Sequence, residues 1–379
     1  MPIQNGKTLY MTMKNFPRSK FEELSDEDQG KILTNFINSE DVLKRMEGLS
    51  GTIVVMNNGN DVFPQKVSAK FPISKKSIPP NEAAIRFIRE FELQSKAYYH
   101  PNIHWPHNFS FHLGTPVAYF RFWEGDLSKL INNDIIIDVE KIAIIIQILY
   151  GLIHLSKRNI VCHQDLKPEN IFFRDYNKTH QLNSNQHIPL TPLIGDFGSV
   201  DLFKEHPIFR GTAPYCAPEQ WKDKSEWNKS DLTEKTNIFT IGIMLFELIS
   251  NGYHPEGSDF TPWHLGKGEA FKNLNRESKW REWINLGCPI NANLDVCYKD
   301  IFDIVKNCME IDPKKRPNPE CLIEVLFESI KLRSNEFYEQ VKLHTNYLNE
   351  IALDENWEFP SKQLSGVKSK VYSYYNIKQ

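Results

Sequence analysis

Hydrophobic and polar positions follow two different rhythms along this chain. The runs GTIVVM and QKVSAKF, from Gly51 to Phe71, are β-branched or alternating and flank the turn sequence NNGND, so they predict a β-hairpin. NEAAIRFIREFELQSKAYY then predicts a helix, and PVAYFRFW predicts another strand. After Trp123 to Asp126 the pattern becomes mostly helical. We therefore expect an α+β protein with a small strand-rich lobe, a larger helical lobe and a cleft between them.

Residues 1–41 form a predicted N-terminal extension. LSDEDQGKILTNFI offers Ser25 as an N-cap with acidic residues in the first turn, which favours a helix. Its apolar residues fall on one helical face: Ile32, Leu33, Phe36 and Ile37. We expect this helix to pack on the main body, with partner binding as the alternative.

Two further segments lie outside the regular pattern. Residues 331–379 predict a C-terminal helix followed by the tail SKQLSGVKSKVYSYYNIKQ, which we expect to be solvated or folded back, although its four lysines and three tyrosines would also suit nucleic acid or a membrane. The polar, turn-rich stretch Arg174 to Pro192 predicts an inserted surface loop.

Composition and apolar segments narrow the class of protein. The 379 residues carry a formal net charge of −3 and are 40% hydrophobic, which gives no general reason to expect nucleic acid as a partner. IAIIIQILYGLI, Ile142 to Ile153, is shorter than the ~20 residues that span a bilayer and contains Gln147, so it predicts a buried core helix and no transmembrane segment. We expect a soluble protein.

Cysteine usage bears on the compartment. The six cysteines form no C-x-x-C pair, and no apolar signal segment precedes them. We expect free thiols in a reducing compartment, and hence a cytoplasmic or otherwise intracellular protein. A secreted effector that acts inside a host cell is the alternative.

Four short motifs occur in a fixed order. They are VSAK (Val67 to Lys70), HQDLKPEN (His163 to Asn170), GDFGS (Gly195 to Ser199) and GTAPYCAPEQW (Gly211 to Trp221). In this order and spacing the chain resembles the eukaryotic-type (Hanks-type) serine/threonine protein kinases over residues 42–330. The resemblance implies the bilobal protein-kinase fold, with an N-lobe at about 42–123 and a C-lobe at about 124–330.

The resemblance also implies ligands and partners. These are ATP, Mg²⁺ (with Mn²⁺ as a substitute) and a protein substrate, while a regulatory partner could use the terminal extensions. Phosphoryl transfer requires a held nucleotide, neutralised charge and an aimed acceptor hydroxyl. By resemblance, Asp165 orients that hydroxyl and accepts its proton, and Lys167 offers an ammonium group to the phosphate. Asn170 and Asp196 supply the oxygen atoms that a hard cation prefers.

The nucleotide-binding residues are expected in the first lobe. Lys70 is expected to contact the phosphates and to pair with Glu90. Glu92 and Glu82 stay open, because the family's run from this glutamate to the HPNI stretch is usually one residue shorter. Gln94 also stands where the family usually has an apolar residue. MEGLSGTIV replaces the glycine-rich loop, with Met46 in place of the first glycine. The remaining positions that match the loop are Gly48, Gly51 and Ile53.

Several residues are expected to support the scaffold. Glu219 in APE should form a buried ion pair with Arg316 in DPKKRP. Asn237 replaces the family's aspartate at the start of a long helix. This change should weaken the hydrogen bonds to the family's catalytic loop, which corresponds here to the HQDLKPEN motif and the residues just before it. Thr212 is assigned to substrate docking and, with Lys167, favours serine/threonine acceptors. The other supporting positions are His163, Phe197 and Gly198.

Gln164 stands where many of the family carry an arginine that binds a phosphorylated activation loop. No Ser, Thr or Tyr lies between Val200 and Gly211. We therefore expect a non-RD kinase that is active without activation-loop phosphorylation. A pseudokinase that acts as a nucleotide-binding scaffold is the alternative, and a kinase for small molecules is a weaker one. Four histidines also cluster: His100, His104, His107 and His112. Imidazole is a common zinc ligand, but neither their spacing nor any accompanying cysteine argues for a zinc site.

Overall fold

The computed structural model describes residues 20–47, 51–59, 64–74, 78–123, 125–131, 136–175, 189–200, 211–222, 232–265, 272–274, 276–354 and 358–378. The chain divides into two compact units, which we describe separately. Unit 1 contains the described residues of Met1–Glu92, Pro106–Phe122 and Glu358–Gln379. Unit 2 contains those of Leu93–Trp105 and Trp123–Trp357.

Unit 1 is built on a five-stranded antiparallel sheet with the strand order β1-β2-β3-β5-β4. Its strands are β1 (Asp41–Glu47), β2 (Thr52–Asn57), β3 (Lys66–Phe71), β4 (Pro106–His112) and β5 (Thr115–Arg121). Its helices are α2 (Asp26–Ile37), α14 (Glu358–Tyr374) and most of α3 (Pro80–Lys96). The predicted hairpin, helix and further strand are all present. β1 was not predicted, because its side chains are mostly exposed and it lacks a buried alternating pattern.

Successive residues of a strand point to opposite faces, and this alternation divides the sheet into two packed surfaces. On one face Val67, Ala69 and Phe71 of β3 join Val117 and Tyr119 of β5 in a cluster that includes Leu33 of α2. On the other face Ala118 and Phe120 join a cluster formed with α3, β4 and α14. Because Lys70 lies between Ala69 and Phe71, its side chain belongs to the α3 face.

The N-terminal helix packs on the sheet, as expected. The Ser25 side chain caps α2 by accepting a hydrogen bond from the Asp28 backbone N–H at 3.2 Å. Leu33 is fully buried, and the half-exposed Phe36 stacks on Tyr119 with ring centroids 5.2 Å apart.

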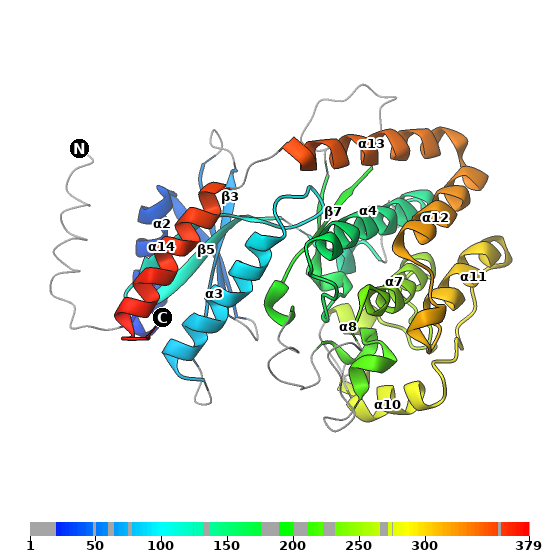
Figure 1. Ribbon diagram of the computed structural model, residues 1–379, viewed down its shortest axis with the longest axis horizontal. Helices are drawn as coiled ribbons and strands as arrows, with labels where there is room; N and C mark the ends of the chain where they lie inside the picture. Colours follow the sequence, from blue (N-terminus) through cyan, green and yellow to red (C-terminus); the bar gives the residue numbers. More distant parts are fainter. Residues whose placement is uncertain are drawn as a thin grey trace. The chain divides into compact units, whose positions relative to one another are not determined.

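The C-terminal tail folds back as a helix, α14, which lies beside α3 and packs on β4 within unit 1 (Figure 1). Folding back was one of the two expected states, but a helix was not predicted there. The apolar positions Leu364, Val367 and Val371 have the spacing of one helical face, whereas lysines, serines and tyrosines dominate the rest of the tail. That polar majority hid the helical signal.

Unit 2 is mainly helical. Its helices are α4 (Asp138–Lys157), α7 (Glu234–Ile249), α8 (Thr261–Leu265), α10 (Glu277–Asn285), α11 (Lys299–Cys308), α12 (Pro319–Arg333) and α13 (Asn335–Asp354). A two-stranded antiparallel sheet of β6 (Ile171–Arg174) and β7 (Thr191–Ile194) accompanies them. A sheet-based unit followed by a helical one confirms the expected α+β fold class.

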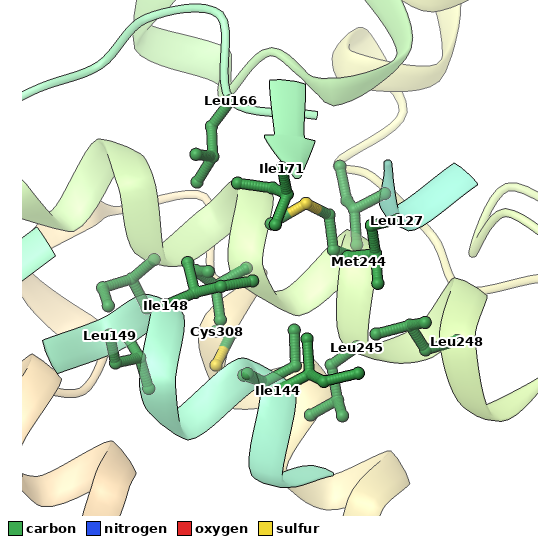
Figure 2. Packing of buried hydrophobic residues seen from close by; sticks show 14 of the residues in the cluster. Leu127, Ile144, Ile148, Leu149, Leu166, Ile171, Met244, Leu245, Leu248 and Cys308 are labelled. Atoms are coloured by element: carbon green, nitrogen blue, oxygen red, sulfur yellow. The ribbon is translucent and has the colours of Figure 1, made fainter. Parts of the chain in front are cut away.

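The core of unit 2 anchors the chain around the HQDLKPEN motif. Ile144 and Ile148 of α4 pack with Leu245 of α7, and all three are fully buried. Leu166 from the motif and Ile171 directly after it extend into the same cluster (Figure 2). The apolar contacts of Leu166 and Ile171 therefore fix the backbone that carries the polar residues of the motif.

The predicted insertion is shorter than Arg174 to Pro192. Arg174 pairs with Thr191 and Phe173 with Pro192 in the β6–β7 ladder, so both ends of that stretch are strand. The turn-forming composition hid these strand ends, because proline rarely occurs in central strands. A two-stranded sheet has only edge strands, so it can accommodate Pro192. The Pro192 carbonyl accepts a hydrogen bond from Asn102 Nδ2 at 3.0 Å. Residues 176–188, which hold most of the predicted loop, lie outside the described part.

Among the described residues, α4 is the one helix long and apolar enough to cross a membrane, and 83% of the relevant window is buried inside the protein. A core helix is expected to be buried in this way, so α4 is only weak evidence for a membrane span. All six cysteines are free thiols.

Shortening a core side chain should destabilise the protein measurably. Ile148→Ala removes three carbons from a fully buried position beside α7, and we expect it to lower the free energy of unfolding by about 2–5 kcal/mol. Leu343→Ala is the control, because Leu343 is 74% exposed and should change stability by less than about 0.5 kcal/mol. Urea unfolding of both variants measures the difference, and equal losses would contradict the assigned core.

Candidate functional site

Unit 1 contains a lysine–glutamate ion pair on the α3 face of the sheet. Lys70 Nζ lies 2.7 Å from Glu90 Oε1, and the two side chains are only 12% and 9% exposed. Of the other glutamates left open by the sequence, Glu92 pairs with Lys368 and Glu82 pairs with Arg86. Glu90 is therefore the residue that contacts Lys70. The role of this pair in nucleotide binding stays a prediction.

Gln94 does not disturb this register, although it replaces an apolar residue. Its side chain is only 3% exposed, and its Nε2 donates to the backbone carbonyl of His104. A buried amide can occupy a packing position when its polar atoms are paired.

Two residues that match the glycine-rich loop lie at the start of β2, Gly51 directly before the strand and Ile53 within it. Ile53 lies directly across from Lys70 in the β2–β3 register. A Cβ atom at Gly51 would come within 2.5 Å of the Phe71 carbonyl oxygen, so the close approach of two backbones requires glycine there. Gly48 lies outside the described residues.

In unit 2 a chain of hydrogen bonds connects three predicted site residues. Lys167 Nζ donates to Thr212 Oγ1 at 2.7 Å, and the Thr212 hydroxyl donates to Asp165 Oδ1, also at 2.7 Å. Lys167 Nζ lies 3.2 Å from the other carboxylate oxygen of Asp165. Residues 45 positions apart thus form one compact polar group, in which the lysine compensates the charge of the aspartate.

Asn170 is fixed beside this group. Its Nδ2 donates to the Asp165 carbonyl oxygen at 2.8 Å and lies 3.3 Å from Asp165 Oδ2. The amide nitrogen is thus directed at Asp165, and the amide oxygen remains the metal-binding type of atom. Asp196 has a left-handed backbone with φ of 55°, a conformation that costs a non-glycine residue about 1–3 kcal/mol and is common at functional sites.

His163 connects the catalytic loop to the GDFGS motif and to α7. Its backbone N–H donates to Asn237 Oδ1 at 3.0 Å, and its Nε2 donates to the Gly195 carbonyl at 2.9 Å. Burial lowers the pKa of His163, so the imidazole is neutral and its proton lies on Nε2. Its ring packs edge-on against Phe197, which is buried and begins the 3-10 turn that includes Gly198.

Asn237 supports the loop differently from the expectation. The sequence suggested only a loss of charge relative to aspartate. In addition to accepting from His163, however, Asn237 Nδ2 donates to the Val161 carbonyl at 3.0 Å. A carboxylate could not make this second bond, so the amide offsets part of the weakening.

Gln164 links the catalytic loop to the GTAPYCAPE segment through its backbone. Its carbonyl oxygen accepts a hydrogen bond from Gln220 Nε2 at 2.9 Å, and its own φ is 65°. A Cβ atom at Gly211, where φ is 128°, would lie 2.5 Å from the same oxygen. These contacts between the two segments are uncharged. Residues 201–210 are outside the described part.

Glu219 and Arg316 form the expected buried ion pair. Arg316 NH1 and NH2 donate to the two Glu219 oxygens at 2.7 and 2.8 Å, and neither side chain is more than 4% exposed. Arg316 also donates to the carbonyls of Glu310 and Lys235, so its buried charge is well paired.

A second charged group, which the sequence analysis missed, lies under the catalytic loop. His264 of α8 donates from Nδ1 to Glu169 at 3.1 Å and from Nε2 to Glu247 of α7 at 2.5 Å. Trp263 Nε1 donates to the same Glu169 oxygen at 3.0 Å, and Tyr215 donates to Glu247 at 3.0 Å. Glu169 belongs to the HQDLKPEN motif, but its partner is 95 residues away and has no motif of its own.

The two carboxylates keep His264 protonated. Burial alone would lower the pKa of His264, but its bonds to Glu169 and Glu247 raise the pKa to about 9. Burial raises the pKa of Glu247, whereas for Glu169 the imidazolium outweighs burial and lowers the pKa. We infer that His264 is an internal cation at neutral pH.

Three of the four clustered histidines have separate partners. His100 accepts from the Asn102 N–H at 3.1 Å, His104 packs against Phe172, and His112 bonds to Ser110 Oγ at 2.8 Å. Within the described part of the chain, no group of three or more His, Cys, Asp or Glu side chains is arranged to hold a metal ion.

Comparison with known families agrees with this arrangement. The family model described as "Protein kinase domain" matches residues 48–327, which is most of the chain. The protein belongs to the protein kinase family, and its relatives support the Hanks type.

Individual relatives are similar at low identity. "Probable serine/threonine-protein kinase nek2" of Dictyostelium discoideum is 28% identical over 58% of this chain and 46% of its own length. "Wee1-like protein kinase" of Oryza sativa subsp. japonica is 28% identical over 50% of this chain and 29% of its own length. "Calcium and calcium/calmodulin-dependent serine/threonine-protein kinase DMI-3" of Medicago truncatula is 25% identical over 51% and 32%, respectively. The chain thus spans less than half the length of these relatives.

The internal cation predicts a pH-dependent stability. Because the pKa of His264 is raised from 6.5 to about 9, its stabilising effect is complete below about pH 6.5 and is lost as the pH rises through 9. Each pKa unit corresponds to about 1.4 kcal/mol, so the loss is on the order of 3 kcal/mol. Urea unfolding between pH 6 and pH 10 measures it.

Variants separate this effect from general alkaline titration. His264→Gln should flatten the difference between pH 6 and pH 10. His344→Gln is the control, because burial lowers the pKa of His344 to about 4 and it stays neutral throughout this range. An unchanged slope in His264→Gln would show that the charge is not held there.

Proposed function

We propose that this protein is an ATP-dependent protein kinase that phosphorylates serine or threonine hydroxyl groups. The observation that carries the proposal is the chain Lys167–Thr212–Asp165, in which a carboxylate and an ammonium group are both bonded to an aliphatic hydroxyl. The family and its named serine/threonine kinase relatives support the same reading.

The residues of unit 2 would act on the acceptor. Asp165 is oriented by bonds from Thr212 and Asn170, so its carboxylate can accept the proton of an incoming hydroxyl without first rearranging. Lys167, 22% exposed, can place its positive charge near the transferring phosphoryl group. In unit 1, Lys70 would bind the nucleotide phosphates while Glu90 fixes the position of its ammonium group.

The donor atoms fit a hard divalent cation. Asp196 offers a carboxylate, and Asn170, whose amide nitrogen is engaged by Asp165, offers an amide oxygen. Two oxygen donors with no nitrogen or sulfur ligand suit Mg²⁺ better than a soft metal. When bound, Mg²⁺–ATP would supply the activated phosphoryl group and neutralise its charge. Asn170 and Asp196 would be the residues that hold the ion.

Control of activity is a further part of the proposal. Gln164 carries no charge, and its described contacts with the Gly211–Trp221 segment are neutral. A phosphate on the activation loop would therefore gain no bidentate ion pair from this position, as it would from an arginine. We propose a non-RD kinase that is active without activation-loop phosphorylation. The free thiols are compatible with an intracellular location, which we also propose.

Phosphate transfer tests the proposed activity. Purified protein with labelled ATP, Mg²⁺ and a generic protein substrate should transfer phosphate to serine or threonine, and Asp165→Asn and Asp196→Ala should each reduce the rate at least 100-fold, because they remove the proton acceptor or a metal ligand. Asp303→Asn, on an exposed face of α11, is the control and should stay within twofold of wild type.

Nucleotide binding distinguishes an enzyme from a scaffold. If wild type and Asp196→Ala label the substrate equally, the enzyme assignment fails. If the wild type binds ATP, as measured by calorimetry, but never transfers phosphate, the pseudokinase alternative is correct.

Phosphatase treatment tests the proposed control. Protein dephosphorylated by a broad-specificity phosphatase, and verified by intact mass, should retain its turnover within about twofold of mock-treated protein, because Gln164 has no positive charge with which to form an ion pair with a phosphate. A fall of tenfold or more that reverses on rephosphorylation would refute independence from activation-loop phosphorylation.

A further inference from the structure

The apolar face of α14 completes the core on one side of the unit 1 sheet. Leu364, Val367 and Val371 are 3%, 4% and 1% exposed, and they recur at the spacing of one helical face. They share a cluster with seven residues of α3, β4 and β5: Ala84, Phe87, Ile88, Phe91, Phe109, Ala118 and Phe120. Without α14, this side of α3 and of the sheet would be exposed to water.

Two polar contacts fix the position of α14. β4 is an edge strand, and its Phe109 N–H, shared with Asn108, donates to Gln363 Oε1 at 3.2 Å. On the α3 side, Lys368 Nζ lies 2.6 Å from Glu92 Oε1. These contacts link α14 to an edge strand and to the helix that carries Glu90, so they define one docked position.

The same cluster extends to the Lys70–Glu90 pair. Phe91 follows Glu90 in α3 and is 1% exposed, with its ring centroid 4.7 Å from that of Phe87 and 5.3 Å from that of Phe109. Lys70 Nζ lies 5.9 Å from the centroid of the Phe91 ring. Residues that press Phe91 into the sheet therefore also determine where Glu90 and Lys70 meet.

We propose that α14 is a positioning element of the active site, and that Leu364, Val367 and Val371 hold α3 so that Glu90 stays on Lys70. The inference rests on the proposed kinase function and extends it, because the C-terminal helix of the same chain sets the geometry of a nucleotide-binding pair. An α3 that loses this support can move away from the sheet, which removes the partner of Lys70 and weakens its contact with ATP.

A charge on the buried face of α14 tests the proposal in the full-length chain. Val367→Asp places a carboxylate in the apolar cluster, and we expect kcat/KM for ATP to fall at least tenfold while amide hydrogen exchange accelerates in α3. Exchange in α7, which belongs to unit 2, should not change. Ser369→Asp is the matched control, since it adds the same charge to an exposed position of the same helix and should leave both readouts within twofold of wild type.

A positioning role is separated from simple destabilisation by rescue. Val367→Ile keeps an apolar β-branched side chain and should retain activity. A synthetic peptide with the sequence of residues 358–374, added in trans to Val367→Asp, should restore kcat/KM at least partly, whereas the same peptide carrying the V367D change should not. Rescue requires an otherwise folded protein with a vacated surface, so it would not follow from global unfolding.

The possible outcomes distinguish a failure of the positioning role from a failure of the proposed kinase function. The positioning role is overturned if Val367→Asp keeps its activity within twofold, or if exchange accelerates equally in α3 and α7 with no rescue by the peptide. If the wild type transfers no phosphate, the proposed function is wrong, and the comparison of α3 exchange in Val367→Asp and Ser369→Asp alone decides whether α14 holds α3.

Discussion

The attachment of the catalytic loop to the buried helix α7 is the constraint on which the chemistry of unit 2 depends. Asn237 accepts from the His163 N–H, and His163 in turn donates to the carbonyl of Gly195, directly before Asp196. Leu166 anchors the same loop in the apolar core. α7 is tightly packed in the core, and packed cores deform little. The two hydrogen bonds of His163, to Asn237 and to the Gly195 carbonyl, therefore fix the segments that carry Asp165 and Asp196 relative to α7.

Buried charge in unit 2 is paired at each place where it supports this loop. Arg316 donates a bidentate pair of hydrogen bonds to Glu219, and His264 donates to both Glu169 and Glu247. Such pairs add little net stability compared with apolar residues of the same size, but removing one partner leaves an uncompensated charge. Their value therefore lies in fixing a single arrangement of the loop and of the segment after it.

The sequence predicted what local patterns and ordered motifs encode. The fold class, the Lys70 strand and the contact between Glu219 and Arg316 were all anticipated. What it missed depends on long-range packing: β1 has mostly exposed side chains, α14 has few apolar residues, and His264 meets Glu169 only after folding. The second hydrogen bond of Asn237 was missed because the comparison with aspartate drew attention to the lost charge and not to the N–H donor that the amide adds.

The discontinuity of unit 1 has a consequence for synthesis. Its core combines residues before Glu92, a short piece from Pro106 to Phe122, and α14, which is made only after the whole of unit 2. Chains emerge from the ribosome at about 5–20 residues per second, and domains usually fold as they emerge. Unit 2 can therefore collapse while unit 1 is still open on one face. The nascent chain would carry an exposed aromatic surface on α3 until α14 arrives, so unit 1 cannot complete its core before unit 2 has been synthesised.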